Sequence, residues 1–284
     1  MATIIDGKRI SGEIRAELAE KTKEFESKYG TVPGLAVIIV GEDPASRVYV
    51  RNKHKACAEV GFYSEVHELP ADSTQQQVIA LIDQLNEQGN IHGILVQLPL
   101  PKHLDEQTIL LRIKPEKDVD AFHPYNVGKI MIGDYNVLPC TPAGVMQLLG
   151  RSGVSAAGKH CVVIGRSNIV GKPMAMLLLH DNGTVTICHS RTPDLKAQTL
   201  QADILVAAVG RAGFVTADMV KPGAVVIDVG INRNADGKLC GDVDFDSVSE
   251  VASMITPVPG GVGPMTITML LQNTLTAAEA TLHN

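Results

Sequence analysis

Five polar side chains in the first part of the chain could bind a substrate or transfer protons. Tyr49 and Lys53 stand four residues apart in a stretch of helical character, so the phenol and the amine share one helix face. Gln97 follows an apolar strand and could place its amide in a binding site. Asp118 and Asp120 lie in a loop rich in proline and aromatics, where they could hold the donors of a heterocycle or cap a turn. Taken separately, the Tyr49–Lys53 pair also fits a solvated helix edge.

A glycine turn in the second half could bind phosphate. The apolar run 162–164 leads into Gly165-Arg166-Ser167 and then into a helix that starts near Gly171. A buried strand, a glycine turn and a helix N-terminus together present backbone N–H groups to an anion. Because Arg166 and Ser167 occupy the early turn, the standard G-x-G-x-x-G pattern is missing, and an ordinary strand-to-helix connection remains the alternative.

The end of the next predicted strand bears on the choice of cofactor. An NAD site usually places an acidic residue there for the ribose hydroxyls, but this chain has Ser190 and Arg191. Ser190 can donate a hydrogen bond, and Arg166 and Arg191 can pair with a phosphate, which suits the 2′-phosphate of NADP. Alternatively, the two arginines are solvated surface residues.

The segment 257–266 is too rich in glycine and proline to form a helix or a strand. Its consecutive glycines would let the backbone approach a ligand closely, and a rigid interdomain turn is the other interpretation. No metal site is predicted, because the acidic run after Gly241 lacks the glycine and glutamate that a calcium loop needs.

The elements that must position these residues alternate between strand and helix, which predicts an α/β fold. The later strands have the rhythm of an open parallel sheet. The stretch 114–141 contains many prolines and glycines, so we expect irregular structure and the main domain boundary there. Helices are predicted at 12–28, 45–60, 75–88, 143–150 and 265–282, and strands at 35–40, 63–69, 93–97, 160–165, 184–189, 204–209 and 224–229.

Length and composition bound the class of protein. With 284 residues, 45% of them apolar, two domains are favoured. Lys and Arg total 25 against 31 Asp and Glu, which argues against nucleic-acid binding. The N-terminus has no apolar stretch of signal-peptide length and the other apolar runs are too short to cross a bilayer, so we expect a cytoplasmic protein without membrane association. Five scattered cysteines are expected to be reduced.

In chain order these stretches resemble the bifunctional methylenetetrahydrofolate dehydrogenase/cyclohydrolase family, along nearly the whole chain. The matching segments are Tyr49-x-x-x-Lys53, Gly93-Ile-Leu-Val-Gln97-Leu-Pro-Leu-Pro101, Lys117-Asp-Val-Asp120, Gly165-Arg-Ser-x-Ile-Val-Gly-x-Pro173, Asp228-Val-Gly-Ile-Asn232 and Pro259–Thr266. One departure is Ala121, where the family usually has glycine. If that backbone needs positive φ, alanine strains it by about 1 kcal/mol.

The resemblance implies an N-terminal α/β folate-binding domain and a Rossmann-like NADP-binding domain with a parallel sheet, with a cleft between them. The domains would comprise residues 1–139, with helix 265–284 packing back on the first, and residues 140–264. It also implies a homodimer that oxidises 5,10-methylenetetrahydrofolate with NADP and hydrolyses the methenyl product to 10-formyltetrahydrofolate.

The resemblance further implies roles for single residues. Lys53 would be the acid/base residue, Gln97 its hydrogen-bonding partner, Tyr49 a substrate-positioning residue and Asp120 the anchor of the pterin. The cofactor contacts that it implies are Gly165, Arg166, Ser167, Ser190 and Ile231, and Pro259, Gly260 and Gly261 would line the folate site. Arg191 is expected at the 2′-phosphate from its position at the end of the predicted strand 184–189. Two alternatives remain at this point: a shikimate dehydrogenase-like NADP enzyme, and a folate- or nucleotide-sensing module without catalysis.

Overall fold

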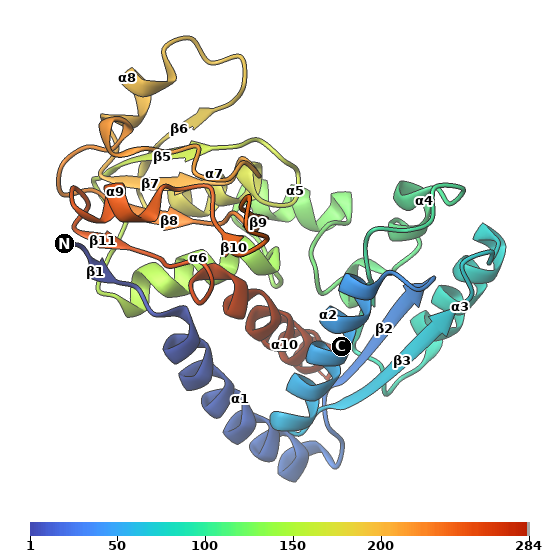
Figure 1. The fold of residues 1–284 in the computed structure, drawn as a ribbon. Coiled ribbons are helices and arrows are strands. Elements are labelled where there is room, and N and C mark those ends of the chain that lie inside the picture. The colour runs from blue at the N-terminus through green and yellow to red at the C-terminus, as the bar shows by residue number, and fades with distance from the viewer. Residues whose placement is uncertain (283–284) are drawn as a thin grey trace. The chain divides into compact units, whose positions relative to one another are not determined.

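The computed structural model describes residues 1–282, which form two compact units (Figure 1). Unit 1 comprises residues 1–12 and 139–266, and unit 2 comprises residues 13–138 with the segment from 267 onward. The last two residues of the predicted 265–284 segment lie outside the described residues. Helices α1 (Gly7–Tyr29) and α10 (Val262–Thr281) contribute residues to both units. Within residues 1–282, no helix is both long and apolar enough to cross a bilayer.

Unit 1 is built on a parallel six-stranded sheet with the strand order β1-β11-β8-β7-β5-β6 (Figure 1). Strands β6-β5-β7-β8-β11 follow the 2-1-3-4-5 order of doubly wound sheets, and β1 extends the far edge. This confirms the predicted parallel sheet. The strands are β1 (Thr3–Ile4), β5 (His160–Ile164), β6 (Thr184–Cys188), β7 (Ile204–Ala207), β8 (Val225–Asp228) and β11 (Met254–Ile255).

Helices cover both faces of this sheet, because its strands are apolar on both sides. Val162, Leu205 and Val226 lie in one buried cluster with Val248 of helix α9. Successive side chains of a strand face opposite sides, so Val163 and Val206 face the side of α7, which packs against β5 and β6. The other elements of unit 1 are helices α6 (Cys140–Arg151), α7 (Gly171–His180), α8 (Leu195–Thr199) and α9 (Phe245–Ser249), and a 3₁₀ turn, η2 (Ala217–Met219).

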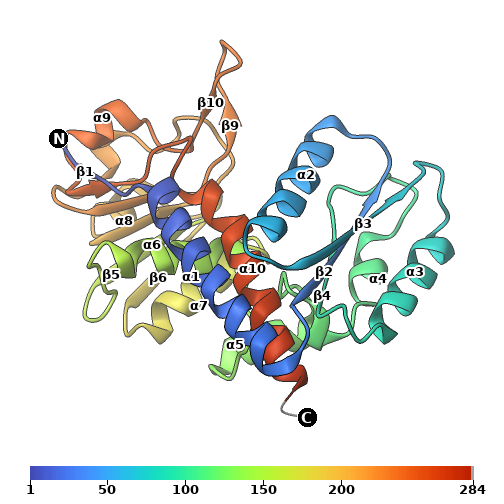
Figure 2. The ribbon, with the colours of Figure 1, turned by 90° about the horizontal axis from the view of Figure 1, so that it is seen from below.

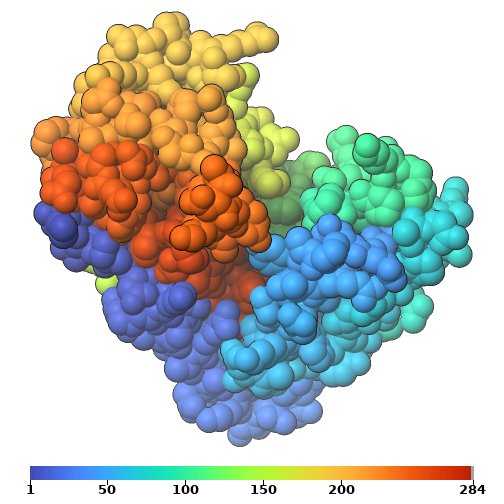
Figure 3. Space-filling model, in the orientation of Figure 1, coloured from blue at the N-terminus to red at the C-terminus, as the bar shows by residue number. Residues whose placement is uncertain are grey.

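A short antiparallel hairpin of β9 (Asn232–Arg233) and β10 (Leu239–Cys240) follows β8. It extends away from the sheet of unit 1 (Figure 2) and forms a protruding knob on the surface of that unit (Figure 3). The sequence analysis did not predict this hairpin, nor the two-residue strands β1 and β11.

Unit 2 contains a parallel three-stranded sheet in the order β3-β2-β4. Ala36, Ile38 and Val96 face α3, whose Val78 and Ile82 complete the buried cluster. Helix α2 packs against β2 and β3. The strands are β2 (Gly34–Val40), β3 (Tyr63–Leu69) and β4 (Gly93–Val96), and the other elements are α2 (Pro44–Glu59), α3 (Gln75–Glu87), α4 (Glu106–Leu110), η1 (Pro115–Lys117) and α5 (Pro124–Ile132).

Two features differ from the sequence analysis. The stretch 114–141 is not irregular throughout, because it holds η1, α5 and the start of α6. Pro124 occupies the first turn of α5 and Gly133 ends it in the left-handed conformation, so the residues taken as loop signals are helix start and stop signals. Residues 1–12, expected in the first domain, group with residues 139–266 because β1 pairs with β11.

Candidate functional site

Helix α2 directs Lys53 toward the sheet of unit 2. Asp43 caps the helix by accepting a hydrogen bond from Ser46 N at 2.8 Å. Ser46, Val50 and Cys57 are buried, and Lys53 lies on the same stripe because the four residues follow helical spacing. Lys53 is half-buried. The amine therefore belongs to the sheet-facing side of α2 and not to its outer edge.

Gln97 meets Lys53 because of the alternation along β4. Ile94 and Val96 lie in the cluster with α3, so Leu95 and Gln97 face the opposite side, where α2 packs. Gln97 N donates to Ile38 O at 2.8 Å and its Nε2 donates to Leu98 O at 2.7 Å. The side-chain oxygen is thereby turned toward Lys53, whose Nζ donates to Oε1 at 3.0 Å.

Gln97, the acceptor in this hydrogen bond, is itself an uncharged amide. One turn further along α2, burial raises the pKa of the Cys57 thiol to about 11, so this group is neutral near pH 7. One turn before Lys53, Tyr49 is 45% exposed and shares its helix face. The arrangement offers an amine with a neutral acceptor beside an accessible phenol.

Asp118 and Asp120 have different environments. Asp118 is 5% exposed, and its Oδ2 accepts from His123 N at 2.8 Å and from Asn126 Nδ2 at 2.9 Å. This carboxylate holds the turn that leads into α5. Asp120 is half-buried. Of the two interpretations that the sequence left open, turn capping applies to Asp118.

The backbone on both sides of Asp120 is fixed by packing. Val119 is fully buried, and its carbonyl accepts from Asn273 Nδ2 of α10 at 2.8 Å. A Cβ at Gly93 would lie 2.7 Å from Val119 Cγ1, which explains why β4 begins with glycine. Ala121 is buried with φ of +56°, so alanine occupies a left-handed position beside Asp120. The positive φ considered in the sequence analysis is therefore present.

The glycine turn after β5 is unusually close to its neighbours. Gly165 has φ of +134°, and a Cβ there would lie 2.3 Å from Ala208 O. A Cβ at Gly171 would lie 2.3 Å from Gly165 O, so the start of α7 packs directly on the turn. Ser167 Oγ accepts from Val170 N at 3.2 Å and Gly171 N at 3.3 Å, and its own proton stays available for donation.

Ser190 and Arg191 lie in a tight turn at the end of β6. His189 N donates to Thr192 Oγ1 at 2.8 Å, and Arg191 N donates to His189 Nδ1 at 3.1 Å. Ser190 and Arg191 are exposed, as are Arg166 and Ser167 after the neighbouring strand β5. Because β5 and β6 pair in parallel, both sets of side chains lie at the same edge of the sheet. Ile231, 56% exposed, follows β8 at that edge.

Sequence reasoning missed the segment 208–211 after β7. The chain passes from β5 to β6 on one side and returns to β7 on the other, so β5 and β7 flank the switch point where doubly wound sheets bind ligands. Residues 208–211 therefore line the binding edge opposite Gly165. The available signal was Gly210, which stands three residues after the fully apolar β7 and has φ of +69°.

The loop with Pro259, Gly260 and Gly261 belongs to unit 1, whereas Lys53, Gln97, Tyr49 and Asp120 belong to unit 2. Lys8 N donates to Gly260 O at 3.1 Å, and a Cβ at Gly7 would lie 1.8 Å from Gly261 O. Gly260 has φ of +107°, and the Val258–Pro259 and Leu98–Pro99 peptide bonds are cis. Close contact with the start of α1 shapes this loop.

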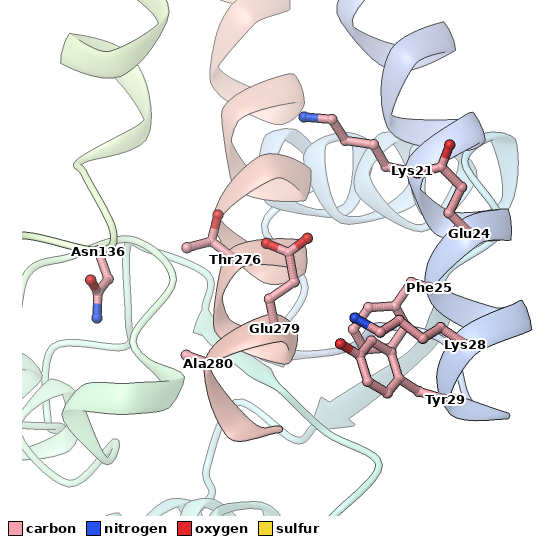
Figure 4. Close-up of a pocket in the computed structure, with 9 residues that line it drawn as sticks. All are labelled: Lys21, Glu24, Phe25, Lys28, Tyr29, Asn136, Thr276, Glu279 and Ala280. Carbon is pink, nitrogen blue, oxygen red and sulfur yellow. The ribbon is translucent and has the colours of Figure 1, made fainter. Parts of the chain in front are cut away.

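A pocket of ≈ 530 Å³ in unit 2 lies apart from the predicted residues (Figure 4). Its lining comes from α1 and α10 and includes Phe25, Tyr29 and Glu279, with Asn136 from a loop. None of the predicted site residues lines it.

Comparison with known proteins relates both halves of the chain to folate enzymes. Residues 5–120 match the catalytic domain of tetrahydrofolate dehydrogenase/cyclohydrolase, and residues 139–282 match its NAD(P)-binding domain. A bifunctional protein FolD from Moorella thermoacetica is 61% identical over 278 residues, which cover 98% of this chain and 99% of that protein.

Solved structures agree with this relationship. The bifunctional FolD enzyme of Campylobacter jejuni is 51% identical, with a TM-score of 0.96 and coverage of 99% of this chain and 100% of the other. A Trypanosoma brucei methylenetetrahydrofolate dehydrogenase-cyclohydrolase complexed with NADP and an inhibitor is 44% identical, with a TM-score of 0.94 and coverage of 100% and 99%. With both domains matched in order over almost its full length, the chain belongs to the tetrahydrofolate dehydrogenase/cyclohydrolase family.

Proposed function

We propose that this chain oxidises 5,10-methylenetetrahydrofolate to the methenyl compound with NADP, and then hydrolyses that product to 10-formyltetrahydrofolate. Family membership supports the pair of reactions. The observation that carries the assignment of residues is the hydrogen bond from Lys53 Nζ to Gln97 Oε1 on the sheet-facing side of α2. A non-catalytic sensing module has no need for an amine held in this way.

The residues at the binding edge of unit 1 fit NADP. Gly165 and Gly171 have no side chains where the turn meets the start of α7, so that the backbone there can approach a pyrophosphate. Ser167 would donate to the cofactor, and Ser190, Arg166 and Arg191 would hold the 2′-phosphate. No acidic side chain occupies the end of β6. When bound, NADP supplies the acceptor for a hydride.

In the oxidation, the chain's own residues bind and orient the folate. The lone pair of a ring nitrogen assists departure of hydride from the methylene carbon, so this step needs no protein acid or base. Tyr49 would position the substrate, and Asp120 would accept hydrogen bonds from the pterin. The fixed backbone around Asp120 supports this role, because Asn273 and Gly93 hold the preceding residue in place.

In the hydrolysis, Lys53 would move protons. Water attacks the methenyl carbon, and neutral Nζ takes one proton from the attacking oxygen. Nζ then donates a proton to N5 as the C–N5 bond breaks, and the remaining hydroxyl proton leaves to solvent as the formyl group forms. A cationic substrate beside Nζ favours the neutral amine, and Gln97 contributes an uncharged acceptor to this amine.

The test compares Lys53→Met with Lys55→Met, a neighbouring and solvent-exposed lysine on the same helix. Loss of the proton-transfer group should lower the cyclohydrolase rate by about 10²- to 10⁴-fold. NADPH formation from the methylene substrate should fall less, and Lys55→Met should retain both activities. Disappearance of the methenyl absorbance measures hydrolysis. Unchanged hydrolysis in Lys53→Met would remove Lys53 from the proposed role.

We further propose that the enzyme acts as a homodimer in the cytoplasm. The resemblance in sequence supports the dimer. All five cysteines are free thiols, and four of them are buried, which suits a reducing compartment. Sedimentation of the purified chain tests the dimer.

A further inference from the structure

Two buried carboxylates lie beneath the binding edge of unit 1. Asp242 is fully buried and Asp228 is 3% exposed. Asp228 ends β8, next to the end of β7, because Ala207 pairs with Asp228. The sequence analysis considered the acidic run around Asp242 only as a metal loop. In the structure, backbone N–H groups surround both carboxylates.

Asp242 holds the segment after β7. Its Oδ2 accepts from Val209 N at 2.6 Å and Gly210 N at 3.0 Å, and its Oδ1 accepts from Arg211 N at 2.8 Å. Asn232 Nδ2 donates to the same Oδ1 at 2.8 Å. Three consecutive N–H groups thus converge on one side chain, as they would around a bound anion. The carboxylate fixes the conformation of this segment.

Asp228 in turn holds the segments next to Asp242. Its Oδ1 accepts from Gly230 N and Asp242 N, both at 2.9 Å, and its Oδ2 accepts from Val243 N at 2.9 Å. Burial raises the pKa of Asp228 to about 6, and these donors act in the opposite direction. The two aspartates therefore tie segments 209–211, 230–232 and 241–243 together.

Glycines leave room for this arrangement. A Cβ at Gly241 would lie 1.8 Å from Asp228 Oδ2, and a Cβ at Gly230 would lie 2.4 Å from Asp242 Oδ1. Burying two adjacent carboxyl groups is costly for stability, and an apolar packing of the same volume would avoid that cost. Above the carboxylates, the accessible groups are Gly210, Arg211 and Ile231, which lie at the switch point with Gly165.

We infer that Asp242 and Asp228 are positioning residues for NADP, because they fix the two segments, 209–211 and 230–232, that form the floor of the cofactor site. This inference rests on the proposed function. It assigns no contact between either carboxylate and the cofactor. Both act through the backbone that they hold.

The test uses the full chain with Asp242→Asn and, as a matched control, Asp246→Asn, an exposed aspartate four residues further on. Asparagine accepts at one oxygen only, and its NH₂ group would face two N–H donors. We expect the Kd for NADPH, measured by fluorescence titration, and the KM for NADP to rise at least tenfold, about 1.4 kcal/mol. Amide exchange at 209–211 in the ligand-free protein should accelerate. Cyclohydrolase rate and KM should stay unchanged, and the control should match wild type.

Asn232→Ala provides a milder variant in case Asp242→Asn does not fold. It removes one of the four donors, so NADPH affinity should fall roughly two- to tenfold. If both variants bind NADPH as tightly as wild type, the inference is rejected. It is also rejected if both activities fall equally while the KM values stay unchanged, because this result indicates general destabilisation. A wild-type enzyme that does not reduce NADP rejects the proposed function together with the inference. If the wild-type enzyme reduces NADP but both variants keep the wild-type affinity for NADPH, only the inference is rejected.

Discussion

Replacing Gly171 with alanine tests whether the turn after β5 depends on the absence of a side chain. The added methyl would lie 2.3 Å from Gly165 O, 2.5 Å from Gly165 C and 2.7 Å from Arg166 N. All three atoms belong to the peptide between Gly165 and Arg166. They cannot rotate away as a flexible side chain could. The start of α7 and the turn must therefore separate.

The expected size follows from these overlaps. Ordinary contact begins near 3.4 Å, so the two segments must move apart by roughly 1 Å. Inserting a methyl into a close-packed site costs about 1–3 kcal/mol, and rigid backbone on the other side places Gly171→Ala near 3 kcal/mol. Gly150 is the control, because it lies in α6 with open space around its Cβ position. Gly150→Ala should stabilise the protein by about 0.5–1 kcal/mol through helix propensity.

Thermal unfolding followed by circular dichroism and NADPH fluorescence titration give the two readouts. Gly171→Ala should melt about 6–12 °C below wild type, and Gly150→Ala should melt slightly above it. NADPH affinity should fall at least tenfold only in Gly171→Ala, because the displaced peptide forms part of the phosphate turn. A Gly171→Ala protein with the melting temperature and NADPH affinity of wild type would refute the reasoning from close approach.

Three further predictions follow from single residues. Arg191→Ala should weaken NADP binding much more than NAD binding, and equal losses in titrations with both would remove Arg191 from the 2′-phosphate site. Ala121→Gly relieves about 1 kcal/mol of left-handed strain. It also loses a buried methyl worth about 0.8 kcal/mol and adds entropy to the unfolded chain, so its unfolding free energy should stay within about 1 kcal/mol of wild type. A larger change in denaturant unfolding would contradict that balance. Hydrogen bonds from Lys221 and from His160 N lower the pKa of Asp203, so its stabilising contribution is present above pH about 4 and is lost as the pH falls further. Asp203→Asn should reduce the loss of unfolding free energy between pH 7 and pH 3 by at most about 1 kcal/mol, because the ion pair is partly exposed. An equal loss in the variant and in wild type would count against this contribution.

The positions of the main elements could be predicted because their signals are local. Strand Tyr63–Leu69 was predicted with its observed bounds, and the helix predicted at 75–88 differs by one residue from α3. Their apolar periodicity and the threonine cap that precedes α3 are properties of neighbouring residues. The two-residue strands β1 and β11 carry no such periodicity. They exist because the existing sheet provides pairing partners.

The candidate chemistry was visible in the sequence only as separate residues. The residue types indicated an amine at Lys53 and an amide at the end of a strand at Gln97, but 44 residues separate the two in the chain. Their contact depends on α2 packing on one particular face of the sheet. Residue type alone did not distinguish Asp118 from Asp120, and the hydrogen bonds from His123 and Asn126 give Asp118 a structural role.

The sequence by itself determined the chemical groups, the order of the elements and the turn glycines, because these depend on residue types and short spacings. Only the tertiary structure decided which groups meet: Gln97 with Lys53, the segment 208–211 with Gly165, and Asp242 with the N–H groups of 209–211. Such contacts join segments 31 to 44 residues apart. Strand order and helix packing bring them together, and neither is written in the local pattern of either partner.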